Sequence, residues 1–269
     1  WDSELAANNI KNLVEKLGAD LYTHVIDWEE YRELMQAFFD ADVIDVELLY
    51  DNAMLAVCYQ QAGNYRVKYI LAGSNTATEG MRLPENWNWF KRDKKNIKNL
   101  GKMRNVRLKT FPAQGTIDYV IYEYFKKIRW ISFLDYLPDY NKFEALEILQ
   151  KNYSYKPYPY KHYESIFTRF YQGFILPVKF GVDKRKNHLS TLVLTGQMKK
   201  EDAEKLLLEI PYPSEQELID DIEYFLKKMR WTKDDLMNYL KRPEKPHTLY
   251  GSEKGLWDAL ARVYKVFHH

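Results

Sequence analysis

Apolar residues recur with helical spacing over the first seventeen positions of the chain. The repeat consists of Leu5, Ile10, Leu13, Val14 and Leu17. Asp2 or Ser3 precedes it, and either side chain can accept a hydrogen bond from an unpaired N–H group of a first helical turn. Gly18 follows it and can adopt the left-handed conformation that ends many helices. The pattern predicts a capped helix at the start of the chain.

Helical and extended patterns then alternate as far as residue 72. The predicted elements are an extended segment at 21–26 (LYTHVI), a helix from Asp27 through Phe39, a helix at 51–62 ended by Gly63, and a strand at 67–72 (VKYILA). Asp27 and Glu30 have the spacing of a capping box. Because helices and not a hairpin turn separate the two extended segments, we expect parallel strands joined by a right-handed crossover. Ligands of such sheets bind beyond the carboxyl ends of the strands, which directs attention to the loop at 73–80.

The pattern changes downstream of this loop. Residues 91–107 are basic and rich in Asn, which is typical of a solvated connector or helix face, and 106–111 (VRLKTF) could form a further strand. From about Ile117 the chain is mostly helical and rich in aromatic residues, which we expect to pack in the core. Thr232 and Asp235 repeat the capping-box spacing, and Pro243 and Pro246 break the segment that follows. We expect an α/β protein with a mostly helical second half.

Composition narrows the class of protein. The 269 residues are 46% hydrophobic and 29% charged, enough for one large or two small domains, and the net charge of +2 indicates no general affinity for nucleic acid or anionic membranes. The single cysteine, Cys58, excludes an internal disulfide framework. No run of about 18 apolar residues and no secretory signal occurs, so we expect a cytoplasmic protein without membrane insertion.

The chain opens on a predicted helix at Trp1 without an initiator Met, and we therefore expect a piece of a longer polypeptide. His268 and His269 at the other end are either a tag remnant or the native end.

Three segments combine residue types that could carry chemistry. The loop GSNTATEG at 73–80 has two glycines, four uncharged hydrogen-bonding side chains and Glu79. It could approach a ligand closely, or it could be an ordinary turn that caps the next helix.

In the second segment, 179–190, Asp183 could cap a helix whose first turn holds Lys184, Arg185 and Lys186. Cations beside free N–H groups favour a phosphate or carboxylate ligand, or else pairing with acidic residues of a neighbouring helix. In the third, 161–172, helical spacing would place Lys161, Glu164, Ser165, Thr168 and Gln172 on one polar face, suited to a substrate or to solvent. The histidines of these segments have no partner at metal-ligand spacing, so we expect no metal site.

Three stretches of the chain resemble bacterial N-acetyl sugar amidotransferases of surface-polysaccharide (lipopolysaccharide O-antigen) biosynthesis. These stretches are WDSELAANNIKNLVEKLGADL, YILAGSNTATEG and KHYESIFTRFYQGFILPVKFGVDKRKNHLSTLVLTGQM. The resemblance runs over nearly the whole chain and is weakest in the last sixty residues. That family belongs to the PP-loop ATP pyrophosphatases, whose fold is a parallel Rossmann-like sheet of the adenine nucleotide alpha-hydrolase type.

The resemblance implies a reaction, partners and a domain division. ATP with Mg²⁺ activates an acetamido oxygen of a nucleotide-linked diacetamido sugar, and ammonia from a partner glutaminase displaces it to leave an acetamidino group. The resemblance further implies a partial PP-loop domain at 1–115 and a helical substrate or partner region at 116–269, with no nucleic acid as ligand.

The resemblance also implies roles for residues. The residues expected to act in catalysis are Glu79, Glu164, Lys179 and Arg185, with Glu79 or Glu164 as the general base. Those expected to bind nucleotide or phosphate are Gly73, Ser74, Asn75, Lys184 and Arg185. Those expected to bind substrate are Thr168, Arg169, Gln172 and His188.

The chain departs from the family in one respect. The SGGKDS-type phosphate loop, which the family carries upstream of the part matching Trp1, does not occur in these residues, and neither do the Cys-x-x-Cys pairs that bind zinc. ATP and zinc would therefore be bound largely upstream, and we expect the isolated chain not to hydrolyse ATP. Two other functions remain open, a tRNA-modifying PP-loop enzyme, motivated by the basic stretch at 91–107, and a non-catalytic interaction module.

Overall fold

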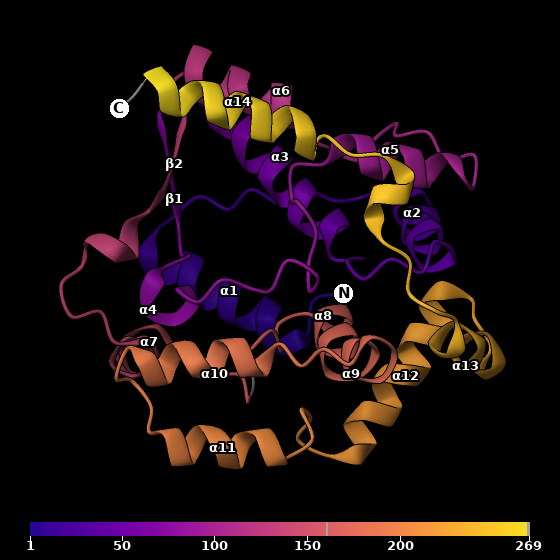
Figure 1. Cartoon of the computed structure of the whole chain (residues 1–269). Coiled ribbons are helices and arrows are strands. Elements are labelled where there is room, and N and C mark those ends of the chain that lie inside the picture. Colours follow the sequence, from indigo (N-terminus) through magenta and orange to yellow (C-terminus); the bar gives the residue numbers. More distant parts are fainter. Residues whose placement is uncertain (160, 268–269) are drawn as a thin grey trace. The chain divides into compact units, whose positions relative to one another are not determined.

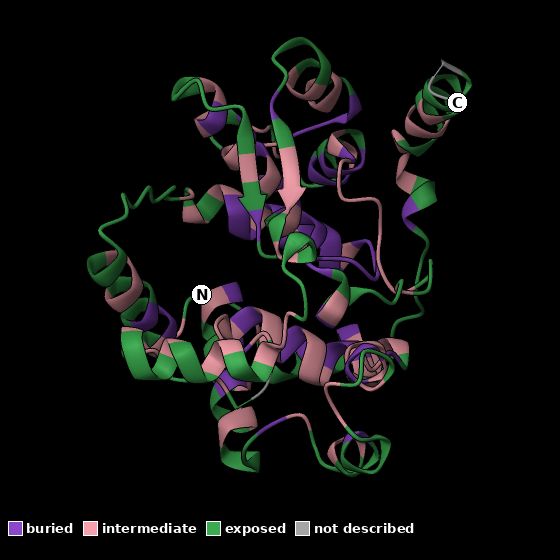
Figure 2. Ribbon diagram, turned by 90° about the vertical axis from the view of Figure 1, so that its left-hand side faces the viewer, coloured by how far each residue is buried: buried purple, intermediate pink, exposed green. Residues whose placement is uncertain are grey.

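The computed structural model describes residues 1–159 and 161–267, so His268 and His269 lie outside the described residues. The chain is mostly helical and contains a two-stranded sheet of β1 (Tyr69–Ala72) and β2 (Arg129–Ser132). The two strands run in the same direction (Figure 2). The expected pairing of residues 67–72 with residues 21–26 was wrong, because β1 pairs instead with β2, although the two strands are parallel. A sheet of this size does not define a Rossmann-like PP-loop fold, which stays a prediction.

The chain divides into two compact units. Unit 1 consists of residues 1–23, 73–83 and 132–241, and unit 2 consists of residues 24–72, 84–131 and 242–269. The expected boundary between residues 115 and 116 lies within unit 2, and the functions assigned to its two sides stay predictions.

The helices of unit 1 include most of the second half of the chain (Figure 1). They are α1 (Glu4–Leu17), α4 (Thr76–Glu79), η2 (Phe133–Tyr136), α7 (Lys142–Tyr153), α8 (Ile166–Phe170), η3 (Tyr171–Ile175), α9 (Leu176–Phe180), α10 (Arg185–Leu194), α11 (Lys200–Leu208), α12 (Glu215–Met229) and α13 (Lys233–Lys241). Those of unit 2 are α2 (Trp28–Asp40), α3 (Leu48–Asn64), α5 (Lys94–Lys102), α6 (Thr116–Val120), η1 (Ile121–Phe125), η4 (His247–Tyr250) and α14 (Lys254–Phe267).

Several helix ends with local signals form as predicted, whereas Gly63, which was expected to end a helix, lies inside α3 and that helix runs on to Asn64. Ser3 Oγ accepts from Ala6 N–H at 3.2 Å at the start of α1, and Gly18 ends that helix with a φ of 60°. Thr232 and Asp235 form a reciprocal capping box, in which Asp235 N–H donates to Thr232 Oγ1 at 3.1 Å and Thr232 N–H donates to Asp235 Oδ2 at 2.8 Å. Such caps need only neighbours in sequence, so they are readable before the fold is known.

Two predicted strands are wrong. Residues 21–26 form no strand, and Leu21, Tyr22 and Val25 are exposed. Residues 106–111 also lack strand structure, whereas β2 formed where we expected helix. Strand propensity becomes structure only where a partner strand is available, and for β1 that partner is β2.

The core of unit 2 forms around α2 and α3, where purple buried segments are concentrated in Figure 2. Tyr59 on α3 is fully buried and packs with Ala62 and Ile128, and Ile70 of β1 and Trp130 of β2 lie against this cluster. One face of the small sheet is thereby covered by apolar side chains.

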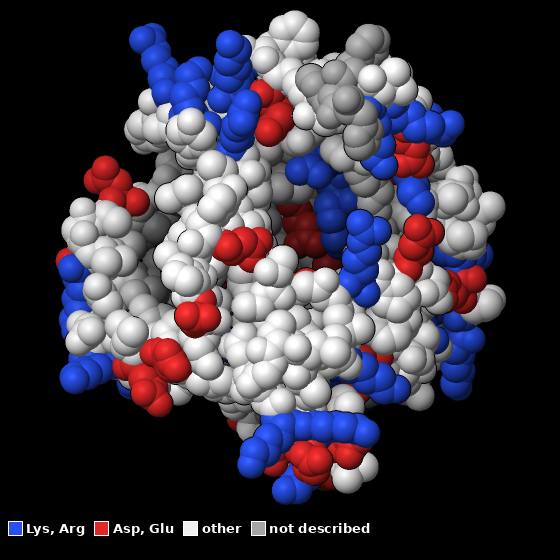
Figure 3. All heavy atoms as spheres, turned by 60° about the vertical axis from the view of Figure 1, so that its left-hand side comes forward, with Lys and Arg blue, Asp and Glu red and all other residues white. Residues whose placement is uncertain are grey.

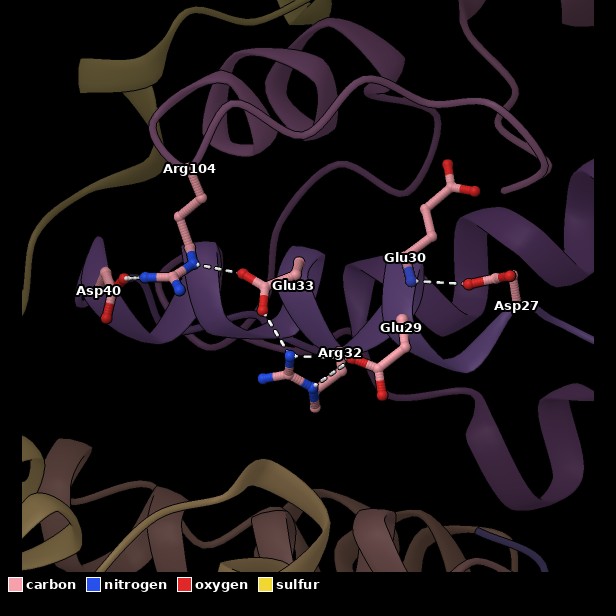
Figure 4. A network of polar contacts seen from close by, with 7 residues as sticks. All are labelled: Asp27, Glu29, Glu30, Arg32, Glu33, Asp40 and Arg104. Carbon is pink, nitrogen blue, oxygen red and sulfur yellow. Dashed lines mark hydrogen bonds and ion pairs between the residues drawn. The ribbon is translucent and has the colours of Figure 1, made fainter.

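Charged side chains tie α2 to the residues that follow α5 (Figure 4). The Arg104 guanidinium donates to Glu33 Oε2 at 2.9 Å and to Asp40 Oδ2 at 2.8 Å. Arg32 donates to Glu33 Oε1 at 2.6 Å and to Glu29 Oε2 at 3.1 Å. The basic stretch at 91–107 is therefore partly a solvated helix face, as expected, and partly a set of ion pairs that join unit 2 together.

The core of unit 1 is aromatic. Phe170 packs on Phe225 of α12 with ring centroids 4.8 Å apart, and Phe225 also meets Trp231 at 5.4 Å. Arg169 and Asp221 are paired beside this core at 2.6 Å for each of two N–H···O contacts. The abundant aromatic residues of this unit thus serve packing, as expected.

The helix that carries this packing begins later than expected. Ser165 caps α8 by accepting from Thr168 N–H at 3.2 Å, and residues 161–164 form a turn instead of helix. A continuous helical polar face from Lys161 to Gln172 was therefore a wrong prediction. The residues on either side of Ser165 pair instead with the start of the chain: Ser3 N–H donates to the Glu164 carbonyl at 2.9 Å, and Ile166 N–H donates to the Trp1 carbonyl at 2.8 Å.

Within residues 1–159 and 161–267, no helix combines the length and the apolar composition needed to cross a bilayer.

Candidate functional site

The loop after β1 is organised by its own side chains. Asn75 Oδ1 accepts from Thr78 N–H at 2.9 Å and thereby caps the short helix α4, while the Asn75 amide donates to the Gly73 carbonyl at 3.1 Å. Ser74 and Ser132, which follows Ile131 in β2, share a hydrogen bond of 2.9 Å between their hydroxyl oxygens. The three residues predicted to bind nucleotide or phosphate in this loop, Gly73, Ser74 and Asn75, therefore shape the turn.

Side chains of helix α10 form hydrogen bonds with the backbone of α4 and of the residues that follow it. His188 Nδ1 lies 3.2 Å from the Thr78 carbonyl, and Asn187 Nδ2 donates to the Met81 carbonyl at 3.1 Å. Met81 N–H donates in turn to Thr191 Oγ1 at 3.4 Å. His188 and the residue before Glu79 are thus brought together, although 110 positions separate them in sequence.

Four charged or titratable side chains gather here, and we call Glu79, Lys142, Lys161 and His188 the α4 cluster. Lys161 Nζ donates to Glu79 Oε1 at 2.7 Å. Lys142 begins α7, and its backbone N–H donates to Gln197 Oε1 at 2.8 Å. Burial and the positive charge of Lys161 lower the pKa of Lys142, while the nearby Glu79 carboxylate opposes that shift.

The charge state of His188 follows from the same neighbours. Burial, followed by the charges of Lys161 and Lys142, lowers the pKa of His188 to about 4. A carbonyl oxygen can only accept, so Nδ1 carries the proton that meets the Thr78 carbonyl, and Nε2 is left as an acceptor. At neutral pH the ring is uncharged.

This arrangement suits an anionic ligand. Lys142 and Lys161 bring two ammonium groups together, beside the carboxylates of Glu79 and Glu164 that interact with Lys161. A bound phosphate or carboxylate would relieve the repulsion between the two lysines, which contributes to the lowered pKa of Lys142. The neutral imidazole adds an acceptor for a hydroxyl or amide proton. The α4 cluster is therefore the candidate functional site of unit 1.

The cations of the predicted basic segment are engaged elsewhere. The Arg185 guanidinium contacts both oxygens of Asp183, the closer at 2.8 Å, and donates to the carbonyls of Leu206 and Glu209 at 2.9 and 2.8 Å. Lys179 Nζ donates to the Tyr239 carbonyl at 2.7 Å and lies over the Tyr239 ring. These contacts join α10 to α11 and α9 to α13, whereas Lys184 occupies the half-buried cap position of α10. Of the two readings of this segment, pairing within the protein accounts for Arg185.

Three more predicted residues lie on α8 and η3, outside the α4 cluster. Arg169 is paired with the buried Asp221, Thr168 follows the Ser165 cap by three residues, and Gln172 is half-buried in η3.

Glu164 lies in the turn before α8, where its carboxylate is 3.4 Å from His162 Nδ1. Burial alone would raise the pKa of Glu164, but the hydrogen bond from His162 and the charges of His162 and Lys161 lower it overall.

Two residues at the candidate site, Lys142 and Gln197, were not predicted from the sequence. Lys142 was not singled out, because its approach to Lys161 and Glu79 depends on the fold and has no local signal. Gln197 was missed for the same reason, although it connects Lys142 to α4 by donating to the Ala77 carbonyl at 3.0 Å.

No group of three or more His, Cys, Asp or Glu side chains is arranged to hold a metal ion among the residues that the structure describes.

One family model matches part of the second half of the chain. Residues 164–264 match the family model described as LPS biosynthesis protein WbpG-like, C-terminal domain. The match runs from the turn before α8 into α14 and supports a family of lipopolysaccharide biosynthesis. No curated protein matches the chain.

Proposed function

We propose that this chain is part of an ATP-dependent amidotransferase that converts an N-acetyl group of a nucleotide-linked diacetamido sugar to an acetamidino group. The observation that carries the proposal is the match of residues 164–264 to the WbpG-like C-terminal domain of lipopolysaccharide biosynthesis. The α4 cluster supports it independently, because a nucleotide-linked sugar brings a diphosphate that needs cations.

We assign a role in this reaction to each residue of the α4 cluster. Lys142 and Lys161 bind the diphosphate, or the carboxylate of a uronic acid. Glu79 holds Lys161 in place at 2.7 Å. His188, neutral at physiological pH, accepts a hydrogen bond at Nε2 from the ammonia that attacks the acetamido carbon and thereby orients it. A partner glutaminase supplies that ammonia.

The described residues fit ATP only in part. The cations of the α4 cluster suit a phosphate group, but Arg185, which was expected to bind phosphate, and Lys179, which was expected to act in catalysis, already donate to protein oxygens. When bound, ATP with Mg²⁺ supplies the activation that makes the acetamido oxygen a leaving group. In our proposal the phosphate loop for ATP is contributed by a segment outside these residues.

The experiment measures AMP release from ATP with ammonium salts and a UDP-linked diacetamido hexose, using a preparation that carries an SGGKDS-type loop ahead of these residues. We expect AMP only when both the sugar and ammonium are present. Lys161→Met should reduce the rate, whereas Lys200→Met, a matched change on α11 where Lys200 pairs with Glu204 at 3.5 Å, should not. The surface of α11, at the bottom of Figure 3, carries both basic and acidic side chains, and we use it as a control region because the proposal gives it no role in the reaction. Absence of sugar-dependent AMP would contradict the proposal.

A further inference from the structure

A hollow of about 350 Å³ lies on the side of α4 that carries Thr76 and Ala77. Its lining consists of Thr76, Ala77, Leu134, Asp135, Leu137, Asp139, Tyr140 and Thr195, all within unit 1. The hollow is open to solvent, and Asp135, Leu137 and Asp139 in its lining are exposed.

The hollow is built by the segments that directly follow the two parallel strands. Residues 73–77 follow β1, and residues 133–140 follow β2. The segments are joined at Ser74 and Ser132, and again where Thr76 N–H and its hydroxyl donate to Asp135 Oδ1 at 2.7 and 3.0 Å. The region beyond the carboxyl ends of adjacent parallel strands is the usual place for a ligand.

The lining offers acceptors without any cation. Asp135 Oδ2, the Asp139 carboxylate and the Tyr140 hydroxyl have no hydrogen-bond partner in the part of the chain that the structure describes. Burial raises the pKa of Tyr140, so its hydroxyl remains protonated at neutral pH. Two carboxylates repel phosphate but accept hydrogen bonds from hydroxyl and amide N–H groups, and Leu134, Leu137 and Ala77 provide apolar contact.

The hollow is connected to the α4 cluster through hydrogen bonds. The Ala77 carbonyl accepts from Thr195 Oγ1 at 2.9 Å and from Gln197 Nε2 at 3.0 Å, and Gln197 Oε1 accepts from Lys142 N–H. Tyr140, in the lining, precedes Lys142 by two residues. A donor-rich group in the hollow and an anionic group at Lys142 and Lys161 could therefore belong to one molecule.

From this juxtaposition we propose that the hollow binds the sugar ring of the nucleotide-linked substrate. Asp135 and Asp139 accept hydrogen bonds from its hydroxyl and acetamido N–H groups, Tyr140 contacts the ring, and the diphosphate lies against Lys142 and Lys161. This inference rests on the proposed function for the nature of the substrate. It adds which side chains recognise the sugar and which recognise the phosphates.

The test measures equilibrium binding of a UDP-linked diacetamido hexose and of UDP alone to the 269-residue chain by calorimetry. Asp139→Asn and Tyr140→Phe should weaken binding of the sugar nucleotide by about tenfold and leave binding of UDP unchanged. Lys161→Met should weaken both ligands. Asp139 has a φ of 57°, a conformation that Asn tolerates well, so its replacement should not disturb the fold. Asp202→Asn, on α11, is the matched control.

Two outcomes would overturn the inference: wild-type chain that binds the sugar nucleotide no more tightly than UDP, or unchanged sugar-nucleotide binding in both Asp139→Asn and Tyr140→Phe. The result is separable from that of the amidotransferase assay. Sugar-nucleotide binding that depends on Asp139, without any AMP release in the catalytic assay, would retain the sugar site and reject the proposed reaction.

Discussion

Replacement of Arg169 can show whether this residue stabilises the fold or binds substrate, the role predicted for it from the sequence. Its guanidinium makes two contacts of 2.6 Å with Asp221, whose side chain is 3% exposed, and the Tyr212 hydroxyl donates to the same carboxylate at 3.3 Å. Replacement of Arg169 by Met preserves much of the apolar stem but leaves Asp221 buried without its cation. Removing one partner of a buried pair costs about 3–5 kcal/mol, because the remaining charge is uncompensated.

The assay is urea denaturation followed by circular dichroism, with sugar-nucleotide binding measured on the same proteins. We expect Arg169→Met to lower the free energy of unfolding by about 3–5 kcal/mol. The double replacement Arg169→Met with Asp221→Leu should recover much of the loss, since two apolar groups need no pairing. If Arg169→Met lost less than about 1 kcal/mol of stability yet abolished sugar-nucleotide binding, the structural interpretation would be refuted and the predicted substrate contact supported.

Further predictions concern stability and packing. His247 is buried, and burial lowers its pKa to about 4. In the unfolded chain the same histidine takes up a proton already below about pH 6.5. The free energy of unfolding should therefore decrease by about 3 kcal/mol as the pH falls from 6.5 to 4. Burial lowers the pKa of His188 as well, so this residue adds to the same pH dependence. Denaturation of wild type and His247→Gln over this pH range isolates the contribution of His247. If the free energy of unfolding depended on pH equally in both proteins, the prediction for His247 would be contradicted. Arg185→Met should destabilise by about 1–3 kcal/mol in denaturation, because the Leu206 and Glu209 carbonyls lose their donor; an unchanged midpoint would exclude this structural role. Gly173→Ala should cost about 1–3 kcal/mol, since a Cβ there would lie 2.8 Å from the Tyr212 ring, and an unaltered melting curve would show that the ring moves freely.

Local sequence signals predicted a substantial part of the fold. The Ser3 and Asp27 caps, the Gly18 terminus and the Thr232 capping box all depend on residues within a few positions of one another. The strand at 69–72 was predicted from its apolar residues, but its partner at 129–132 was not. Helix caps are predictable because the stabilising partner is nearby in the chain.

The sites were less predictable, because their residues come from distant segments. Glu79 and His188 were singled out by sequence, but Lys142 and Gln197 became visible only through α7 and α10. Lys184 and Arg185 illustrate the converse. Their position at the start of a helix indicated an anion site, yet Asp183 and the carbonyls at the end of α11 already satisfy Arg185. The start of a helix favours an anion, but only the fold shows whether a ligand or an acceptor of the protein itself, such as the Asp183 carboxylate, occupies that position.

In the reaction that we propose, a nucleotide-linked diacetamido sugar receives nitrogen at the expense of ATP, with the help of the α4 cluster. The most direct measurement follows isotopically labelled ammonium into the sugar by mass spectrometry, with ATP and a preparation that carries the phosphate loop. We expect that one acetamido oxygen is replaced by labelled nitrogen, and that Lys161→Met slows this replacement while Lys200→Met does not. Unlabelled sugar after complete incubation, or labelling at equal rates in both variants, would contradict the proposal.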